Sequence, residues 1–192
     1  NMKTVRVFIR AKNEAKALEK TLLEIKKQEM KPLEIVILDN DSQDGTAEVA
    51  NRCGAKVERF SDAEFTYGRA LNQSLKLTGG DIIVFLSVHS PPCSIQWLTE
   101  LVNPIAAGKT KVTFGRQVPI AGFNVYEEWF VLRNFPAKRS AFQEMLGLQL
   151  DTFSNGNAAV TRNLLEKYPF REDLAFAEDI EWSERLEKQG EV

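Results

Sequence analysis

Three aspartates stand close together after an apolar run and are the first candidates for chemistry in this chain. Residues 33–38 are mostly Leu, Ile and Val, and Asp39, Asp41 and Asp44 follow them. Such a run is typical of a parallel strand buried on both faces, and these strands bind ligands beyond their carboxyl ends. Asp44 also has a simpler role, because an Asp in a turn can cap the next helix. The turn does not require Asp39, which is therefore the stronger candidate for a ligand contact.

The alternating oxygen-bearing side chains of this cluster invite comparison with a calcium-binding loop. Asp39, Asp41 and Gln43 hold alternate positions, as the calcium ligands of an EF-hand do. The sixth position is Asp44, where that loop needs Gly, and the twelfth is Ala50, where it needs a bidentate Glu. The sequence therefore excludes an EF-hand.

Further candidates for proton transfer or metal binding occur later in the chain. Glu178 and Asp179 open a predicted helix, where the helix dipole favours carboxylates without any further role. A carboxylate there can also take a proton from an attacking hydroxyl group. His89, the only histidine, follows Ser87 at the end of the most apolar predicted strand. Imidazole suits borderline metal ions better than Mg²⁺, which prefers carboxylate and water oxygens.

The elements that position these residues alternate between strand and helix. Strands are predicted at residues 5–9, 33–38, 56–60, 81–86, 112–116 and 158–161, and helices at residues 14–27, 46–52, 69–77, 95–102, 126–133 and 178–188. This order indicates an α/β fold with right-handed βαβ units around a mostly parallel twisted sheet. Asn13 is predicted to cap the first helix. Ile180 and Leu186 are predicted to face inward from the last helix, which Gly190 ends.

Length and composition fit one domain over residues 1–192. The chain is 43% hydrophobic, and its net charge of -2 gives no general attraction to nucleic acid. The spacing of Cys53 and Cys93 indicates neither a disulfide framework nor a metal knuckle, so we expect a cytoplasmic protein. No apolar run reaches the roughly 18 residues that cross a bilayer. Another strand would normally begin at residues 191–192, so we expect a truncated carboxyl-terminal part.

Five motifs together carry a resemblance to a known family. Residues 7–14 and 37–46 look like the first two strands and the nucleotide-binding turns of the family 2 glycosyltransferases. Residues 115–119, 153–157 and 177–182 look like a bacterial subgroup described as rhamnosyltransferase-like. The resemblance covers essentially the whole chain and implies a GT-A fold.

The resemblance implies that a nucleoside diphosphate sugar, with UDP or dTDP as its nucleotide, lies across the carboxyl edge of the sheet. The residues it assigns to nucleotide binding are Arg10, Lys12, Asn13, Glu14, Asp39, Asp41, Arg69 and Ser87. Asp39 would accept from the imide N–H of uracil or thymine, and Asp41 would reach the ribose. Arg69 suits the diphosphate, because a guanidinium binds phosphate oxygens bidentately, although a solvated helix charge is the alternative.

The resemblance also assigns catalysis and sugar binding. Asp179 would be the base that takes the proton of the acceptor hydroxyl, with Glu178 holding it or the acceptor in position. The residues expected at the donor sugar or acceptor are Arg116, Ser154, Asn155 and Trp182. For Trp182 a place in the core is the alternative, because aromatic side chains in such segments are often buried.

The chain departs from the family pattern after the fourth predicted strand. Where many relatives have Asp-x-Asp to hold a divalent metal, this chain has Ser87, Val88 and His89. Three interpretations stay open for His89: a ligand for an ion such as Mn²⁺, a metal-free contact to the diphosphate, or a sign of lost activity. A divalent cation, Mn²⁺ or Mg²⁺, is therefore an open part of the hypothesis.

The sequence predicts an inverting glycosyltransferase that moves a hexose or deoxyhexose from a UDP or dTDP sugar to an acceptor hydroxyl. The expected acceptor is a saccharide or a lipid-linked saccharide of a bacterial surface polysaccharide, which would bring the protein to the inner face of the membrane. The alternative is a nucleotide-sugar-binding protein with weak or no catalysis, because His89 replaces the metal-binding Asp. A nucleotidyltransferase is disfavoured, since residues 10–14 after the first strand contain no Gly-rich loop.

Overall fold

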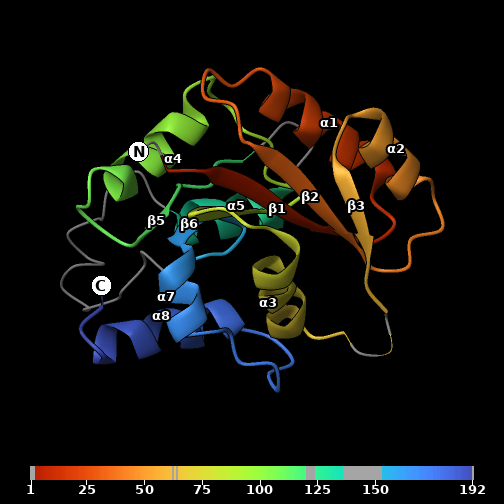
Figure 1. Ribbon diagram of the computed structural model, residues 1–192. Coiled ribbons are helices and arrows are strands. Elements are labelled where there is room, and N and C mark those ends of the chain that lie inside the picture. The colour runs from red at the N-terminus through yellow and green to blue at the C-terminus, as the bar shows by residue number, and fades with distance from the viewer. Residues whose placement is uncertain (1–2, 62, 64, 120–123, 136–152, 192) are drawn as a thin grey trace.

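A six-stranded sheet forms the centre of the protein (Figure 1). The computed structural model describes residues 3–61, 63, 65–119, 124–135 and 153–191. The strands are β1 (Val5–Ala11), β2 (Glu34–Asp39), β3 (Lys56–Arg59), β4 (Ile82–Leu86), β5 (Val112–Phe114) and β6 (Asn157–Thr161). Their order is β3-β2-β1-β4-β6-β5, and β6 runs opposite to the other five strands. The prediction of a mostly parallel α/β sheet is confirmed.

Helices cover both faces of this sheet, giving three layers (Figure 1). The helices are α1 (Ala15–Lys26), α2 (Thr46–Arg52), α3 (Tyr67–Leu77), α4 (Trp97–Ala106), α5 (Val125–Asn134), α7 (Arg162–Lys167) and α8 (Glu178–Lys188). Alternate residues of β1 enter different cores, because successive side chains of a strand point to opposite faces. Val7 and Ile9 pack with residues of α1 and α4, whereas Phe8 packs with residues of α3, α7 and α8. Helix α7 was not predicted.

The core beneath the sheet fixes α8 through stacked aromatic rings. Trp182 is fully buried, with its ring centroid 5.0 Å from that of Phe170, and its Nε1 donates to the backbone oxygen of Tyr168. The prediction that Ile180 faces inward is wrong, since its side chain is 41% exposed. At about 100° per residue, Trp182 and Leu186 lie on one side of α8 and Ile180 on the other. Gly190, with a φ of 67°, follows the end of α8 as predicted.

The amino terminus of α1 is capped from the loop after β2. Three successive backbone N–H groups donate to that loop: Asn13 to Ser42 Oγ at 2.9 Å, Glu14 to Thr46 Oγ1 at 2.9 Å, and Ala15 to Asp44 Oδ2 at 3.0 Å. The prediction that Asn13 caps α1 is wrong, because the N-cap position is Glu14 and Asn13 Oδ1 accepts from the backbone N–H of Gln43. Asp44 also accepts from the backbone N–H of Thr46, the first residue of α2, in line with its predicted turn role.

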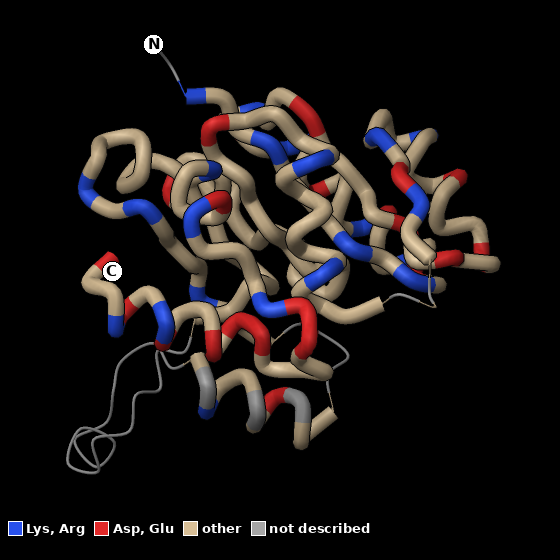
Figure 2. Tube along the Cα trace, turned by 60° about the horizontal axis from the view of Figure 1, so that its bottom comes forward, with Lys and Arg blue, Asp and Glu red and all other residues tan. Residues whose placement is uncertain are grey.

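Charged residues of both signs are interspersed along the trace (Figure 2). Arg6 pairs with Glu34 at 3.2 Å, and Arg185 pairs with Glu181 at 2.9 Å along α8. The four side chains are only partly buried, and ion pairs that keep contact with water contribute little to stability. No helix in the described ranges has both the length and the apolar character needed to cross a membrane.

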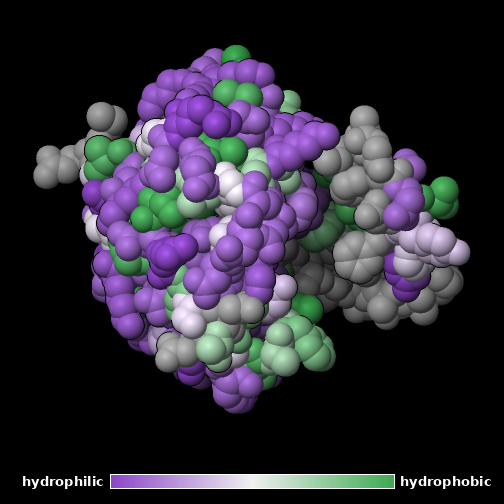
Figure 3. Space-filling view, turned by 90° about the vertical axis from the view of Figure 1, so that its right-hand side faces the viewer, coloured by the Kyte–Doolittle hydropathy of each residue, from purple (hydrophilic) through white to green (hydrophobic). Residues whose placement is uncertain are grey.

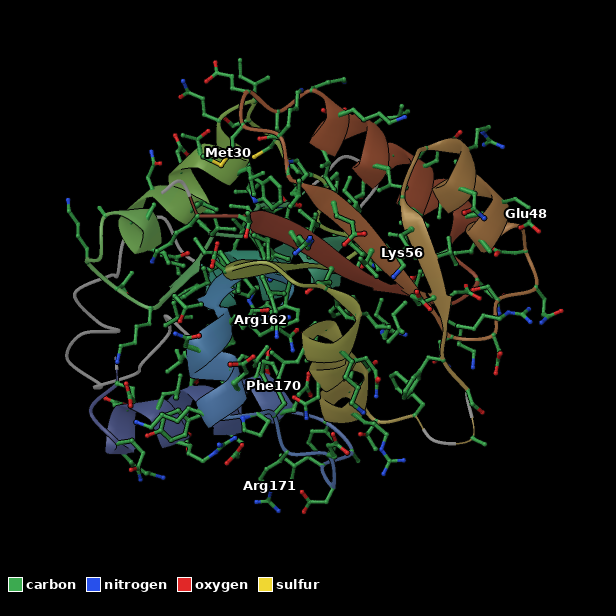
Figure 4. The ribbon with its side chains drawn as sticks, in the orientation of Figure 1. Met30, Glu48, Lys56, Arg162, Phe170 and Arg171 are labelled. Carbon is green, nitrogen blue, oxygen red and sulfur yellow. The ribbon has the colours of Figure 1, made fainter. Side chains whose placement is uncertain are left out.

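Arg162 is the exception among the charged side chains, because it ties three backbone segments together. It begins α7 and reaches the carboxyl end of α3 (Figure 4). Its guanidinium donates to the backbone oxygens of Leu75, Thr78 and Gly80, and it pairs with Glu166 at 2.9 Å. Leu75 lies in the last turn of α3, and Thr78 and Gly80 lie between α3 and β4, so Arg162 replaces helix and strand partners that these carbonyl groups lack.

We expect Arg162→Met to lower the free energy of unfolding by about 2 kcal/mol, since partly buried carbonyl groups lose a charged donor while the aliphatic stem is kept. Urea denaturation monitored by circular dichroism measures this change. Lys188→Met is the matched control, because its exposed ammonium is 3.8 Å from Glu184 and should contribute almost nothing. Equal effects of the two substitutions would contradict the role given to Arg162.

Candidate active site

A cavity of about 110 Å³ opens at the carboxyl ends of the parallel strands. Its lining comes from the ends of β1 and β4, the start of α3, and the segment before β6: Phe8, Arg10, Glu14, Tyr67, Leu71, Phe85, Leu86, Ser87, Val88, His89, Asn155 and Gly156. Strands β1 and β4 are adjacent and parallel, so their carboxyl ends meet. The fold thereby brings together five of the residues predicted for the site: Arg10, Glu14, Ser87, His89 and Asn155.

A larger cavity of about 370 Å³ lies at the opposite, amino-terminal edge of the sheet. It is lined by charged side chains, among them Lys111, Lys167 and Glu191. Hydrogen bonds from Lys111 and Lys167 lower the pKa of Glu191 to about 2, so both ammonium groups already pair with this one carboxylate. Parallel sheets bind ligands at their carboxyl edge, and we therefore take the smaller cavity as the candidate site.

Asp39 ends β2 beside the last residue of β1 and is 1% exposed. Its Oδ2 accepts from the backbone N–H of Ser42 at 3.2 Å. Its Oδ1 is buried and has no hydrogen-bond partner among the described residues. A buried acceptor without a partner costs about 1 to 3 kcal/mol, so this oxygen is well suited to accept a hydrogen bond from a ligand.

Glu14 and His89 form a second polar contact at the cavity. His89 Nε2 lies 2.6 Å from Glu14 Oε1, and the two side chains are 65% and 19% exposed. Glu14 Oε2 is buried and has no hydrogen-bond partner among the described residues. The backbone N–H of His89 donates to Ser87 Oγ at 3.2 Å, which holds the turn after β4. The candidate metal residue therefore faces a carboxylate from a different strand end.

Asn155 contacts both candidate catalytic carboxylates. Its Nδ2 donates to Glu178 Oε1 at 2.8 Å, and its backbone N–H lies 3.4 Å from Asp179 Oδ2. Burial raises the pKa of Glu178, against the hydrogen bond from Asn155. Burial likewise raises the pKa of Asp179, against backbone donors that include Ile180. A carboxylate with a raised pKa is a better proton acceptor, as a general base requires.

Arg10 reaches the cavity between two aromatic rings that the sequence reasoning missed. Its guanidinium carbon lies 5.3 Å from the ring centroid of Phe65 and 5.2 Å from that of Tyr67. Such cation–π contacts hold a guanidinium in place while leaving its N–H groups directed elsewhere. Arg69 was predicted for the site, but Tyr67, two residues earlier, lines the cavity and Arg69 does not.

Several predicted residues lie outside the cavity lining. Arg69 pairs with Glu172 at 3.4 Å, and Arg116 Nε donates to the backbone oxygen of Phe135 at 3.0 Å. Ser154 Oγ accepts from Gln117 Nε2 at 3.2 Å. The residues that lie in the two neighbouring turns without lining the cavity are Lys12, Asn13 and Asp41, and the last two have positive φ angles of 53° and 52°.

Trp182 does not reach the site, because it is fully buried in the core below the sheet. Of the two roles considered for Trp182, sugar binding and packing in the core, the structure shows packing in the core. Phe153 is also buried and lies 5.1 Å from Trp182 between ring centroids.

The side of the molecule that carries α2 and β3 is hydrophilic over most of its described surface, with small separate hydrophobic patches (Figure 3).

The chain belongs to glycosyl transferase family 2, whose family profile matches residues 6–169. The family predicted from the motifs is thereby confirmed. "Glycosyltransferase AglE" from Haloferax volcanii is 26% identical over 200 residues, which cover 97% of this chain and 62% of that protein. "O-antigen chain rhamnosyltransferase WbaN" from Salmonella anatum is 25% identical over 176 residues, which cover 85% of this chain and 54% of that protein. The chain spans only part of the length of these relatives.

Solved structures confirm the GT-A fold. Glucosyl-3-phosphoglycerate synthase from Mycobacterium tuberculosis in complex with UDP is 25% identical with a TM-score of 0.67, covering 97% of this chain and 66% of that one. Mannosyltransferase PcManGT from Pyrobaculum calidifontis, in complex with GDP-Man and Mn²⁺, is 22% identical with a TM-score of 0.70, covering 100% of this chain and 54% of that one.

The family relationship raises the question of a divalent cation, since both enzymes are known in structures with Mn²⁺. No three His, Cys, Asp or Glu residues converge as metal ligands within the described ranges. Glu14 and His89 supply two ligand groups, one of them with the unpartnered Oε2. Two protein ligands suffice for an ion that is also held by substrate phosphates and water. The residues therefore fit a cation that binds together with a phosphate ligand.

We expect Glu178→Gln to raise the melting temperature at neutral pH. The raised pKa of Glu178 makes its contribution to stability complete below its ordinary value of 4.5, and that contribution is lost as the pH rises through the folded-state value. Glutamine carries no charge and its Oε1 can still accept from Asn155, so the gain should vanish at about pH 4. Melting curves across this pH range test the prediction. Glu184→Gln, an exposed control on α8, should show no such gain.

Proposed function

We propose that this chain is the donor-binding and catalytic domain of an inverting glycosyltransferase. It would move a hexose or deoxyhexose from a UDP or dTDP sugar to an acceptor hydroxyl. The observation that carries the proposal is the cavity at the carboxyl edge of the sheet, where Arg10, Ser87 and Asn155 meet next to the carboxylates of the buried Glu178 and the half-buried Asp179. Family membership supports the reaction class, and the rhamnosyltransferase names of two relatives support a surface polysaccharide as the product.

The nucleotide would lie over the ends of β1 and β2. The unpartnered Oδ1 of Asp39 would accept from the imide N–H of uracil or thymine, and Asp41 would contact the ribose. Arg10 is the cavity's own guanidinium, and we propose it for the diphosphate in preference to Arg69, which pairs with Glu172. A guanidinium suits this role because it presents several N–H donors to phosphate oxygens.

Chemistry would proceed as a single displacement at the anomeric carbon. Asp179 would take the proton of the acceptor hydroxyl as that oxygen attacks, and the nucleoside diphosphate would leave from the opposite face of the sugar. Asn155 would hold Glu178 by its side chain and Asp179 by its backbone, so both carboxylates keep one orientation. Arg116 and Ser154 would bind the donor sugar or the acceptor only after exchanging their present partners.

We expect Asp39→Asn to weaken UDP binding by about tenfold or more, because an amide turned toward the imide N–H offers a donor instead of an acceptor. Wild-type protein with UDP or dTDP at about a hundred times the dissociation constant should gain about 2.7 kcal/mol of stability in a thermal shift assay. Asp173→Asn, an exposed carboxylate paired with Arg171, is the control. Absence of any shift with either nucleotide would overturn the donor-site assignment.

We expect Asp179→Asn to abolish sugar transfer while nucleotide binding persists, because the amide cannot accept the proton of the acceptor. Transfer measured from a panel of UDP and dTDP sugars, beside UDP affinity measured by calorimetry, separates the two effects. Loss of nucleotide affinity in this variant would make Asp179 a binding residue. Normal nucleotide binding without transfer in the wild-type protein would favour the alternative, a nucleotide-sugar-binding protein in which His89 replaces the metal-binding Asp.

A further inference from the structure

We infer that Glu14 and His89 together hold a borderline divalent cation, such as Mn²⁺, which binds with the donor diphosphate and is preferred over Mg²⁺. The inference rests on the proposed function, because the diphosphate would complete the ion's ligands. It adds to that function a second protein ligand, Glu14, from the turn after β1. It also replaces the expected carboxylate-only site with a mixed pair of imidazole and carboxylate.

The fold already places the two side chains together. Glu14 is the N-cap residue of α1, and His89 follows β4 by three positions, yet Nε2 and Oε1 lie 2.6 Å apart at the same cavity. The backbone N–H of each residue is held by a hydroxyl group, that of Thr46 for Glu14 and that of Ser87 for His89. The pair is therefore positioned by the backbone before any ligand arrives, as a binding site requires.

The second oxygen of Glu14 points to a missing partner. Oε2 is buried without a hydrogen-bond partner among the described residues, although Glu14 lies beside solvent-exposed His89. A buried acceptor left without a partner destabilises the folded protein. A cation bound next to His89 would give Glu14 Oε2 the partner that it lacks among the described residues.

The site should depend on the nucleotide. Two protein ligands leave most positions of an ion to phosphate oxygens and water, which is the common arrangement for ions that accompany nucleotide phosphates. Arg10 lines the same cavity and its positive charge opposes a bare cation, whereas a bound diphosphate would reverse the local charge. We therefore expect weak binding of the cation alone and much stronger binding with UDP.

The choice of ion follows from the ligand type. An imidazole nitrogen is a poorer ligand for Mg²⁺ than a carboxylate oxygen, whereas later divalent ions of the first transition series accept it readily. His89 stands where the family pattern has an Asp, so the substitution removes one negative charge and one hard oxygen from the site. Both changes act against Mg²⁺ more than against an ion that binds nitrogen.

The test measures the affinity for UDP by calorimetry in chelator, in Mg²⁺ and in Mn²⁺, and scores the ratio between conditions within each variant. For the wild-type protein, Mn²⁺ should tighten UDP binding by about tenfold or more over chelator, and Mg²⁺ by clearly less. In Glu14→Gln and in His89→Ala, the affinity for UDP should be about the same in Mn²⁺ as in chelator. His89→Asp should shift the gain toward Mg²⁺. Glu48→Gln is the matched control, because this exposed carboxylate lies on the outer side of α2 (Figure 4) and should keep the wild-type ratio.

A spectroscopic readout complements the affinities. The electron paramagnetic resonance signal of free Mn²⁺ should fall further when UDP is added to wild-type protein than when the same UDP is added without protein, because UDP alone also binds Mn²⁺. Either loss variant should show no decrease beyond that of UDP alone. UDP binding that is equal in chelator and in Mn²⁺ would overturn the cation site and leave the proposed donor site standing. Failure of UDP and dTDP to bind under any condition would overturn both. A Mn²⁺ ratio retained by Glu14→Gln would remove Glu14 from the site.

Discussion

The candidate site depends on the hydrogen bonds that join the loop after β2 to the start of α1. Side chains of Ser42, Asp44 and Thr46 accept from three successive N–H groups that α1 itself cannot satisfy. The same contacts fix the turn after β1, which follows Arg10 and carries Glu14, against the turn after β2, which follows Asp39. The aspartates after the apolar run of β2 therefore differ in role. Asp44 caps α1 and accepts from the start of α2, whereas Asp39 has a buried oxygen without a partner among the described residues.

A second constraint acts from below the sheet, where Trp182 anchors α8. Its ring is packed between Phe153 and Phe170, and its N–H group is bonded to Tyr168. Burial of an aromatic side chain of this size contributes roughly 3 kcal/mol, so α8 is held firmly at one turn from its start. Glu178 and Asp179 occupy that first turn, and Asn155 meets them from the segment before β6. The rigid position of both carboxylates is thus a consequence of the core.

The strands, the helices flanking them and the edge that carries the site were predictable from the sequence, because hydrophobic periodicity and turn residues act locally. Features that depend on distant partners were not predictable. Asn13 looked like a cap, but the cap comes from residues about thirty positions away. Arg69 looked like a phosphate ligand, but Glu172 lies within reach only in the folded chain. The sequence around Trp182 is compatible with stacking on a sugar and with packing in the core. Only its burial in the folded protein shows that it packs in the core.

The buried polar atoms without partners show where the fold gives up stability. Of the four such side-chain atoms in the described ranges, two are carboxylate oxygens at the candidate site, on Glu14 and Asp39. Glu14 lines the cavity and Asp39 ends the neighbouring strand β2, and each unpartnered oxygen costs the folded protein free energy that a ligand would return on binding. Protein interiors satisfy most of their polar groups, so two exceptions at one edge of one sheet are informative. Glu14 lies against His89, and Asp39 lies against the turn after β2. The proposed cation site and the proposed nucleobase site are therefore separate.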